Sequence, residues 1–284
     1  MRYAKKHGHL IFLAAFLTLN VFVWSAVFAE ERDGLVVAFL DIGQGDAIFI
    51  EAPNGTQVLL DGGANKKVLS ELAAIMPFHD RSIDMVIASH PDQDHIGGLP
   101  SVLARYQVGM VMDPGLEHDT AAYRELERMV EEKNIERVIA RRGQIVWLDD
   151  GVYLEILFPD RDPAGWDTND ASIVARLVYG DTSFMLTGDS PQKIERYLVG
   201  LEGDNLASDV LKLGHHGSKT STSEVFLGFV SPAYTIISAG RENQYGHPHK
   251  EVLELVGRFG IPILATYERG TVVVRTDGTH ISID

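Results

Sequence analysis

The run His90-Pro91-Asp92-Gln93-Asp94-His95 is the feature that most restricts how this chain can fold. It follows an apolar segment, residues 83–88, that has the composition of a buried strand. Four potential ligands within six residues can reach one site only if the loop turns sharply, which the following Gly97-Gly98 permits. The run therefore predicts a divalent metal site at the carboxyl end of a strand, where layered α/β folds place their chemistry.

Short β-rich segments alternate with helical ones from residue 35 onward. Asn54-Gly55 is typical of a hairpin turn between two of these segments. Strand clusters in both halves, each followed by helices, predict an α/β (α+β) fold in which two sheets pack face to face with helices outside. We expect strands at 35–40, 47–52, 57–60, 83–88, 145–148, 154–158, 173–178, 183–187, 210–213, 234–238, 262–266 and 271–275, and helices at 121–133, 192–199 and 250–259.

Residues 1–29 have the composition of a signal peptide or a membrane anchor. Arg2, Lys5 and Lys6 precede an apolar run at residues 10–29, and Val27-Phe28-Ala29 forms an acceptable cleavage site. The run is also about the length that spans a bilayer, so both interpretations stay open, with cleavage favoured. We expect residues 30–284 to form the functional domain outside the cytoplasm, either secreted or held at the membrane by residues 10–29.

The composition limits both the ligands and the partners. The chain has no cysteine, so a metal site has to be built from His, Asp and Glu side chains. Its formal charge is −15, and subtracting the three basic residues of 1–29 takes the remainder to −18. Such a body repels polyanions at long range, which counts against tight, long-range nucleic-acid binding. Bound divalent cations would still admit a phosphodiester at a local site.

Histidines gather in three short clusters. Asp189, two residues after the last residue of the expected strand 183–187, can bridge two cations about 3.5 to 4 Å apart, with a helix cap as the alternative role. His215 is the expected metal ligand of its cluster, and His216 is expected to support it or to face the substrate, because one loop seldom donates adjacent ligands. Six of the eleven histidines form the clusters, which are His90/His95, His215/His216 and His247/His249.

His247 and Lys219 are further candidates for the site. His247 precedes Pro248 in a rigid turn and can either protonate a leaving group or complete the shell of a metal. Lys219 can meet a phosphate oxygen as a point charge. A structural imidazole and a solvated surface lysine are the corresponding alternatives, and the residues alone leave these alternatives open.

Seven motifs, taken in order along the chain, are specific enough to indicate a family. They are Asp41-Ile42-Gly43-Gln44-Gly45-Asp46, Asp61-Gly62-Gly63, the run at 89–98, Asn169-Asp170-Ala171-Ser172, Leu186-Thr187-Gly188-Asp189, Gly214-His215-His216-Gly217-Ser218 and Gly246-His247-Pro248. Together they resemble the metallo-β-lactamase superfamily, and within it the hydrolase domains of ComEC competence proteins. The resemblance covers residues 35–284. It implies a four-layered αββα sandwich of the metallo-β-lactamase type with two divalent metal ions, zinc or manganese, at one edge of the sheets.

The chain departs from the superfamily pattern at two positions. The usual run is His-x-His-x-Asp-His, whereas Asp92 stands at the second histidine, as it does in the ComEC-like branch. An oxygen ligand moves metal preference from zinc toward manganese and counts against a β-lactam substrate. The third histidine expected for the first metal is also missing, and Asn169-Asp170 stands in roughly its place.

The resemblance implies phosphodiester hydrolysis, with DNA as the leading substrate. The implied ligands are Asp94, His95, Asp189 and His215 for one metal and His90, Asp92 and Asp189 for the other, with Asp94 and His247 catalytic and Lys219, Asn169 and His216 facing the substrate. A phosphocholine-type or other small ester is the alternative substrate. A metal-stabilised surface binding module without turnover is the alternative that is not an enzyme.

Overall fold

A computed structural model describes residues 8, 10–21 and 34–284 of the chain. The chain divides into two units, Met1–Asp33 and Gly34–Asp284, which are described separately. In the shorter unit residues 8 and 10–21 are helical, and their apolar side chains are exposed. Within the described residues, none of the helices combines the length and the hydropathy needed to span a bilayer. The predicted cleavage position after Ala29 lies outside the described residues.

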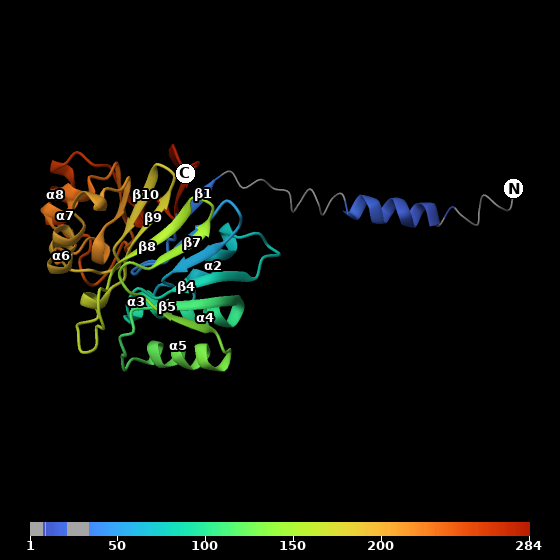
Figure 1. Ribbon diagram of the computed structural model, residues 1–284, viewed down its shortest axis with the longest axis horizontal. Coiled ribbons are helices and arrows are strands. Elements are labelled where there is room, and N and C mark those ends of the chain that lie inside the picture. Colours follow the sequence, from blue (N-terminus) through green and yellow to red (C-terminus); the bar gives the residue numbers. More distant parts are fainter. Residues whose placement is uncertain (1–7, 9, 22–33) are drawn as a thin grey trace. The chain divides into compact units, whose positions relative to one another are not determined.

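An eight-stranded mixed sheet forms one half of the longer unit (Figure 1). Its order is β15-β14-β1-β2-β3-β4-β5-β6, antiparallel as far as β3 and parallel from β3 to β6. The turn at Asn54-Gly55 joins β2 to β3 in the predicted hairpin. The strands are β1 (Leu35–Phe39), β2 (Ile48–Glu51), β3 (Gln57–Leu60), β4 (Ser82–Ile87), β5 (Gln107–Asp113), β6 (Glu136–Ile139), β14 (Val272–Thr276) and β15 (Ile281–Ile283).

A seven-stranded mixed sheet forms the other half. Its order is β13-β12-β11-β10-β9-β8-β7, parallel from β13 to β10 and antiparallel beyond. The strands are β7 (Ile145–Asp149), β8 (Val152–Phe158), β9 (Val174–Tyr179), β10 (Thr182–Leu186), β11 (Val210–Lys212), β12 (Tyr234–Ile237) and β13 (Ile263–Ala265). In both sheets the parallel strands therefore bring several carboxyl ends, and the loops that follow them, to one edge.

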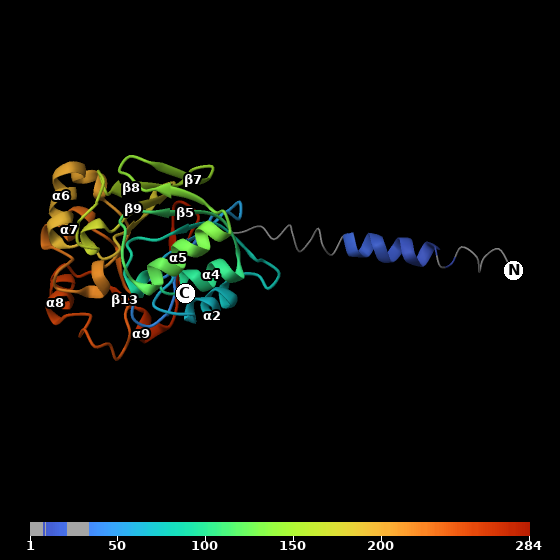
Figure 2. The same cartoon turned by 90° about the horizontal axis from the view of Figure 1, so that it is seen from below.

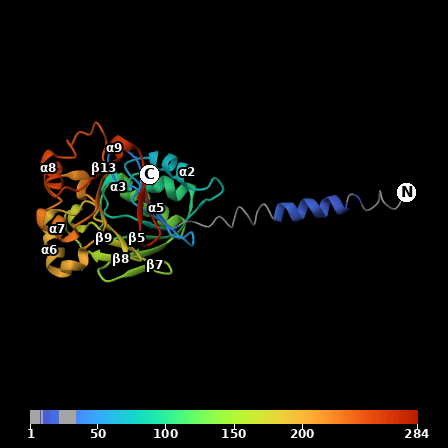
Figure 3. The ribbon, with the colours of Figure 1, turned by 90° about the horizontal axis from the view of Figure 1, so that it is seen from above.

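Helices cover the outer face of each sheet. On the first sheet lie α2 (Lys67–Ile75), α3 (Gln93–Ile96), α4 (Leu99–Arg105) and α5 (Ala121–Glu132), and on the second α6 (Gln192–Glu202), α7 (Glu224–Val230) and α8 (Lys250–Arg258), while α9 (Thr266–Arg269) follows β13. Figure 2 and Figure 3 show α6 and α7 grouped together and apart from α2. The short 3₁₀ segments are η1 (Asn169–Ala171), η2 (Gly203–Leu206) and η3 (Gly214–Gly217).

Three hydrophobic cores correspond to the three contacts between four layers. The central core joins side chains of both sheets, such as Phe39 and Phe184. A second core packs the first sheet against α2, α4 and α5, and a third packs the other sheet against α6, α7 and α8. Burial of apolar surface on both faces of each sheet is what holds such a sandwich together. The predicted αββα architecture is confirmed.

Most predicted elements are present, whereas α2, α7, β15, β5 and β6 are not among the predicted ones, and the last two have recognisable causes. The expected helix at 121–133 is α5, which begins after Thr120, whose hydroxyl accepts a hydrogen bond from Tyr123 N. The edge strand β6 was missed because three of its four side chains are exposed, so it lacks the apolar signature of a strand. Strand β5 contains Gly109, where a Cβ would approach Asp84 O to 2.6 Å, and glycine obscures a strand pattern.

Candidate metal centre

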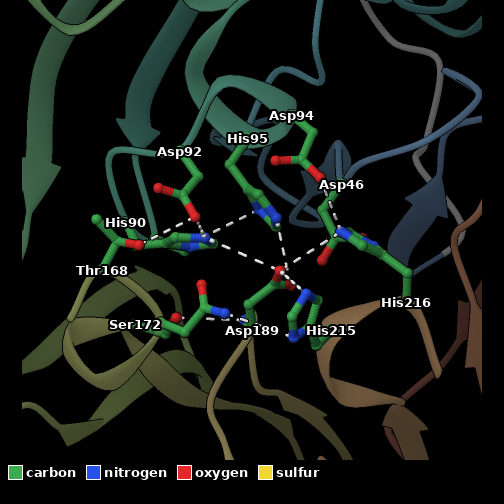
Figure 4. A network of polar contacts seen from close by, with 12 residues as sticks. Asp46, His90, Asp92, Asp94, His95, Thr168, Ser172, Asp189, His215 and His216 are labelled. Carbon is green, nitrogen blue, oxygen red and sulfur yellow. Dashed lines mark hydrogen bonds and ion pairs between the residues drawn. The ribbon is translucent and has the colours of Figure 1, made fainter. Parts of the chain in front are cut away.

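Two histidine loops approach each other at one edge of the sheets. The first histidine loop, residues 89–98, follows β4 and includes α3. The second histidine loop, residues 214–218, follows β11 and includes η3. Asp189 lies between them, three residues beyond Leu186, the last residue of β10. Figure 4 shows the imidazoles of both loops directed toward Asp189.

The first half of the first histidine loop places His90 and Asp92 together. His90 is fully buried, and its Nε2 lies 3.5 Å from Asp92 Oδ2 and 3.9 Å from Asp189 Oδ2. Its Nδ1 faces Ser89 Oγ at 3.0 Å. Thr168 donates its hydroxyl proton to Asp92 Oδ2 at 3.0 Å, which fixes the carboxylate. The structure thus brings together the two residues predicted to hold one metal.

His95 in α3 is supported from behind by Asp61. Its Nδ1 lies 2.8 Å from Asp61 Oδ2, and its Nε2 lies 3.2 Å from Asp189 Oδ1. Asp61 also accepts hydrogen bonds from the backbone N–H and the hydroxyl of Ser89. A carboxylate on the outer nitrogen of a histidine orients the ring and makes the inner nitrogen a better ligand. Asp61 belongs to one of the seven family motifs, but no residue near it in the sequence indicates this supporting role.

The two adjacent histidines of the second histidine loop both reach Asp189. His215 and His216 have φ values of 49° and 55°, so two successive residues adopt the left-handed conformation. This unusual backbone turns both rings inward, and each Nε2 lies 3.5 Å from Asp189 Oδ2. Both rings therefore face Asp189, whereas the sequence predicts His215 as the ligand and His216 as its support or as substrate-facing; the ligand role of each stays a prediction.

The two histidines differ in burial and in their contacts. His216 is fully buried, and its Nε2 lies 3.3 Å from Asp94 Oδ2. His215 keeps a quarter of its side chain exposed and contacts Thr220 Oγ1 through Nδ1. The structure thus favours His216 as the ligand partner of Asp94 and leaves His215 on the open side of the cluster.

Asp46 is a further member of the cluster that the sequence did not single out. It is 1% exposed, its Oδ1 lies 3.2 Å from His216 Nδ1, and its Oδ2 accepts a hydrogen bond from Lys212 Nζ at 2.8 Å. The preceding Gly45 has φ +119°, and a Cβ there would lie 2.0 Å from Asp94 O. Only glycine allows this loop to pass so close to Asp94, so the spacing Gly45-Asp46 was a signal that could have been read.

The donor set fits a metal ion. Asp46, His95, Asp189 and His216 each offer a ligand atom within 4.8 Å of the others. Among the described side chains, the Nε2 atoms of His90, His95 and His216 are buried and have no hydrogen-bond partner. Buried polar nitrogens without partners are costly, and three of them facing carboxylates are satisfied together by a cation. The site is therefore a buried His/Asp metal site.

The charges of the cluster are mutually dependent. Burial opposes ionisation of Asp94 and Asp189, but the neighbouring imidazoles, foremost His216, hold the pKa of both carboxyl groups well below the usual value. Burial likewise opposes protonation of His95 and His216, yet Asp189 raises the pKa of His95 above its ordinary value and that of His216 to about 9. The carboxylates therefore favour positive charge at the centre of the cluster.

The other predicted residues lie at different distances from the cluster. Asn169 places Nδ2 3.5 Å from His215 Nδ1. The rings of His247 and His215 have centroids 5.1 Å apart, and burial together with His215 lowers the pKa of His247 to about 4. The role of His247 as proton donor stays a prediction. An uncharged imidazole is better suited to donating a hydrogen bond than to transferring a proton. Lys219 is exposed, and its backbone N–H donates to His249 Nδ1, so the structure does not bring its side chain into the cluster.

A groove of about 400 Å³ reaches the cluster at Asp94. Its lining includes Gln44, Gln93, Asn243 and Tyr245, which are polar or aromatic. The ring of Tyr245 stacks on that of His247 with centroids 5.7 Å apart. The volume lies in the range of small-molecule sites, so a substrate group can occupy the groove while it contacts the cluster.

The fold and the metal site define the class of protein. The Metallo-beta-lactamase superfamily profile matches residues 40–241, and the chain belongs to this superfamily. Solved structures share the fold at low identity. Igni18, a metallo hydrolase from Ignicoccus hospitalis, aligns with a TM-score of 0.56 at 16% identity over 85% of this chain and 99% of its own. Zn(2+)-bound PqqB from Methylobacterium extorquens aligns with a TM-score of 0.52 at 10% identity over 85% of this chain and 100% of its own.

Within the superfamily this is a ComEC-like domain. ComE operon protein 3 of Bacillus subtilis is 35% identical over 264 residues, which are 84% of this chain and 33% of that protein. Competence protein ComA of Neisseria gonorrhoeae is 35% identical over 256 residues, 89% of this chain and 34% of that protein. Recombination protein 2 of Haemophilus influenzae is 34% identical over 240 residues, 83% of this chain and 28% of that protein. The chain thus spans about a third of the length of the curated relatives it matches.

Proposed function

We propose that this chain is a metal-dependent phosphodiesterase that uses two divalent cations, zinc or manganese, with DNA as its leading substrate. The observation that carries the proposal is the oxygen-rich donor set. Asp92, Asp94 and Asp189 face the buried imidazoles, and Asp92 stands where the commoner superfamily pattern has a histidine. Carboxylate oxygens suit manganese as well as zinc, and such paired sites act on phosphate esters.

The proposal divides the ligands into two groups that share Asp189. His90 and Asp92 would hold one cation, because their side chains face each other beside Asp189. Asp94, His95 and His216 would hold the other. Asp189 presents one oxygen to His95 and the other to His90 and His216, so it is placed to bridge the two groups.

The chemistry follows from this arrangement. Divalent cations, when bound, would activate a water for attack on phosphorus and offset the negative charge that develops there. His215, on the open side of the cluster, can donate a hydrogen bond to a phosphate oxygen, as can the Nδ2 group of Asn169 beside it. His247 is neutral and can donate an N–H to the departing oxygen. The groove that begins at Asp94 would receive the group attached to the phosphate.

The choice of DNA rests on the relatives and is restrained by charge. The relatives carry names for competence and recombination, processes that handle DNA, which supports a nucleic-acid phosphodiester. The charge of −15, or −18 without residues 1–29, opposes tight polyanion binding, so we expect local contact at the metals. The same charge favours the second candidate, a phosphocholine-type or other small phosphate ester.

We also propose that the unit Gly34–Asp284 acts outside the cytoplasm. The basic residues before the apolar run at 10–29 support export, followed by cleavage after Ala29 or retention at the membrane. Fractionation of cells producing the full chain, with N-terminal sequencing of the recovered protein, tests this. Recovery of uncleaved chain from the cytoplasmic fraction would contradict export.

The enzymatic proposal is tested with the purified chain loaded with manganese or zinc. We expect metal-dependent hydrolysis of bis-p-nitrophenyl phosphate and of linear DNA, and none of the β-lactam nitrocefin. Turnover of the small diester without DNA cleavage would select the small-ester candidate. Stable metal binding with no turnover of either diester would refute the phosphodiesterase and favour a metal-stabilised binding module.

A further inference from the structure

Lys212 is a fully buried lysine that the proposed reaction does not use. It is the last residue of β11, and among the described residues it is the one lysine in the buried class. Its ammonium donates to Asp46 Oδ2 at 2.8 Å and to Leu213 O at 3.0 Å. A buried ion pair is weak evidence for stability, because desolvation consumes most of the attraction between the charges. Lys212 therefore calls for a role other than holding the fold together.

Asp46 joins Lys212 to the metal site. Its other oxygen, Oδ1, lies 3.2 Å from His216 Nδ1, and that nitrogen donates its hydrogen bond to Ser238 O at 3.0 Å. The opposite nitrogen of the same ring, Nε2, faces Asp94 and Asp189. Asp46 thus contacts the nitrogen of His216 that does not face Asp94, while one of its oxygens also lies within 4.8 Å of ligand atoms of His95 and Asp189 (Figure 4).

We propose that Lys212 is a positioning residue that holds Asp46 as the support of His216 and keeps it from becoming a metal ligand. Distance alone would admit Asp46 as a ligand, since it lies within 4.8 Å of His95, Asp189 and His216. The ammonium of Lys212, however, already holds Oδ2, and Oδ1, which has no hydrogen-bond partner among the described residues, faces the outer nitrogen of His216 at 3.2 Å. The inference rests on the metal site and not on the identity of the substrate.

The backbone around Asp46 restricts how its carboxylate can move. Its backbone N–H donates to Asp94 O at 3.2 Å, and the close approach of Gly45 to the same carbonyl locks the loop in place. The carboxylate can therefore change its direction only by side-chain rotation. An ammonium at 2.8 Å opposes that rotation and competes with a cation for the same oxygen. Removal of Lys212 would free the Asp46 carboxylate beside the site.

The first test separates a ligand from a support. In the full-length chain, His216→Ala and Asp46→Asn are compared by bound manganese or zinc per protein and by affinity in competition with a chelator. Asp46→Asn should keep the wild-type metal content and lower affinity by about 10- to 100-fold, the usual effect of removing a support behind a histidine ligand. His216→Ala should lose bound metal. If Asp46→Asn loses metal to the same extent, Asp46 is a ligand and the proposal is wrong.

The second test asks whether Lys212 acts through Asp46. The double variant Lys212→Met/Asp46→Leu replaces the ion pair with apolar groups, which often costs no stability. We expect its thermal midpoint, measured with chelator, to be at least as high as that of Lys212→Met, while its metal affinity stays about 10- to 100-fold below wild type. If the ion pair were purely structural, the double variant would regain both the thermal midpoint and the metal affinity of the wild type. Wild-type metal affinity in the double variant would therefore overturn the proposal.

A matched lysine supplies the control. Lys193→Met removes an exposed ammonium that pairs with Asp170, and it should leave metal affinity within two-fold of wild type, a change of about 0.4 kcal/mol. The test also remains decisive if Lys212→Met alone does not fold, because Asp46→Asn and the double variant each give a metal affinity. Since these measurements need no substrate, a chain that binds metal but cleaves no phosphodiester refutes the proposed reaction and leaves this inference standing.

Discussion

The two histidine loops bring imidazoles to one aspartate in different ways. In the first histidine loop, His95 is backed by Asp61, and neutral donors of Ser89 satisfy that carboxylate. In the second, Asp46 faces the outer nitrogen of His216, and a buried ammonium pairs with one oxygen of that carboxylate. The first loop carries its histidines on ordinary backbone, whereas the second needs two successive left-handed residues.

The two loops also differ in how far apart in the sequence the residues that hold them in place lie. The first histidine loop is closed by nearby backbone, since Gly62 N donates to His95 O and Gly98 N donates to Gly63 O. The second depends on Asp46, which is 166 residues from Lys212, and on Glu195 in α6. A strained backbone persists only when its surroundings impose it. The second loop should therefore respond more strongly to changes at distant positions.

The largest effect is expected at Asp189, which both loops share. Asp189→Ala removes the carboxylate that faces His95 at 3.2 Å and His216 at 3.5 Å, so the two ligand groups lose their common member. Metal content should fall, and metal-dependent hydrolysis should drop by about 10⁴-fold, the scale of losing a central catalytic group. The exposed Asp162→Ala, in the loop before Asn169, is the control. Full metal content in Asp189→Ala would show that the loops bind independently.

The next effect distinguishes the two residues of the second histidine loop. His216→Ala should remove bound metal and lower turnover by about 10³-fold, because the buried ring faces Asp94. His215→Ala should retain the metal and lower turnover by about 100-fold at most, because its ring lies on the open side. Measuring bound metal and kcat for both variants shows which of the two histidines contributes more to metal binding. The reverse order would restore the ranking drawn from the sequence.

The first histidine loop could be predicted from the sequence because its information is local. Six consecutive residues contain the four donor side chains, and the apolar segment before them identifies the strand that delivers them. The sheets and most strands were likewise readable, because their apolar patterns are local as well. Edge strand β6 was missed for the converse reason, since its exposed side chains leave no such pattern.

The second histidine loop could not be predicted in the same way. The direction of His215 and His216 depends on left-handed backbone angles, which non-glycine residues rarely adopt and which no residue preference signals. The roles of Asp46, Asp61 and Lys212 depend on contacts between parts of the chain that the fold brings together. Gly45 was the one local sign, because a glycine before an aspartate suggests a close approach of backbone.

A smaller effect is expected where the loop of Asp46 passes the first histidine loop. Gly45→Ala would place a Cβ 2.0 Å from Asp94 O, so the carbonyl and the carboxylate of Asp94 must shift. We expect a loss of about 1–3 kcal/mol in the free energy of unfolding and a fall in turnover of up to about 100-fold. Gly43→Ala is the matched control, because Gly43 also has positive φ but has open space around a Cβ. Equal losses in the two variants would mean that backbone strain, and not the contact with Asp94, sets the cost.

The smallest effect on turnover is expected at Glu195, which anchors the chain beyond the second histidine loop. Its carboxylate accepts the backbone N–H groups of Thr222 and Ser223, both at 2.6 Å and both buried. Glu195→Ala leaves these donors without a partner and should cost about 1–3 kcal/mol, measured by denaturant unfolding, with metal content unchanged. Glu224→Ala, an exposed carboxylate 3.8 Å from Arg258, should cost less than about 0.5 kcal/mol. If the two variants are equally stable, the contacts of Glu195 do not stabilise the second histidine loop. The ion pair between Lys212 and Asp46 would then be the distant contact on which that loop depends.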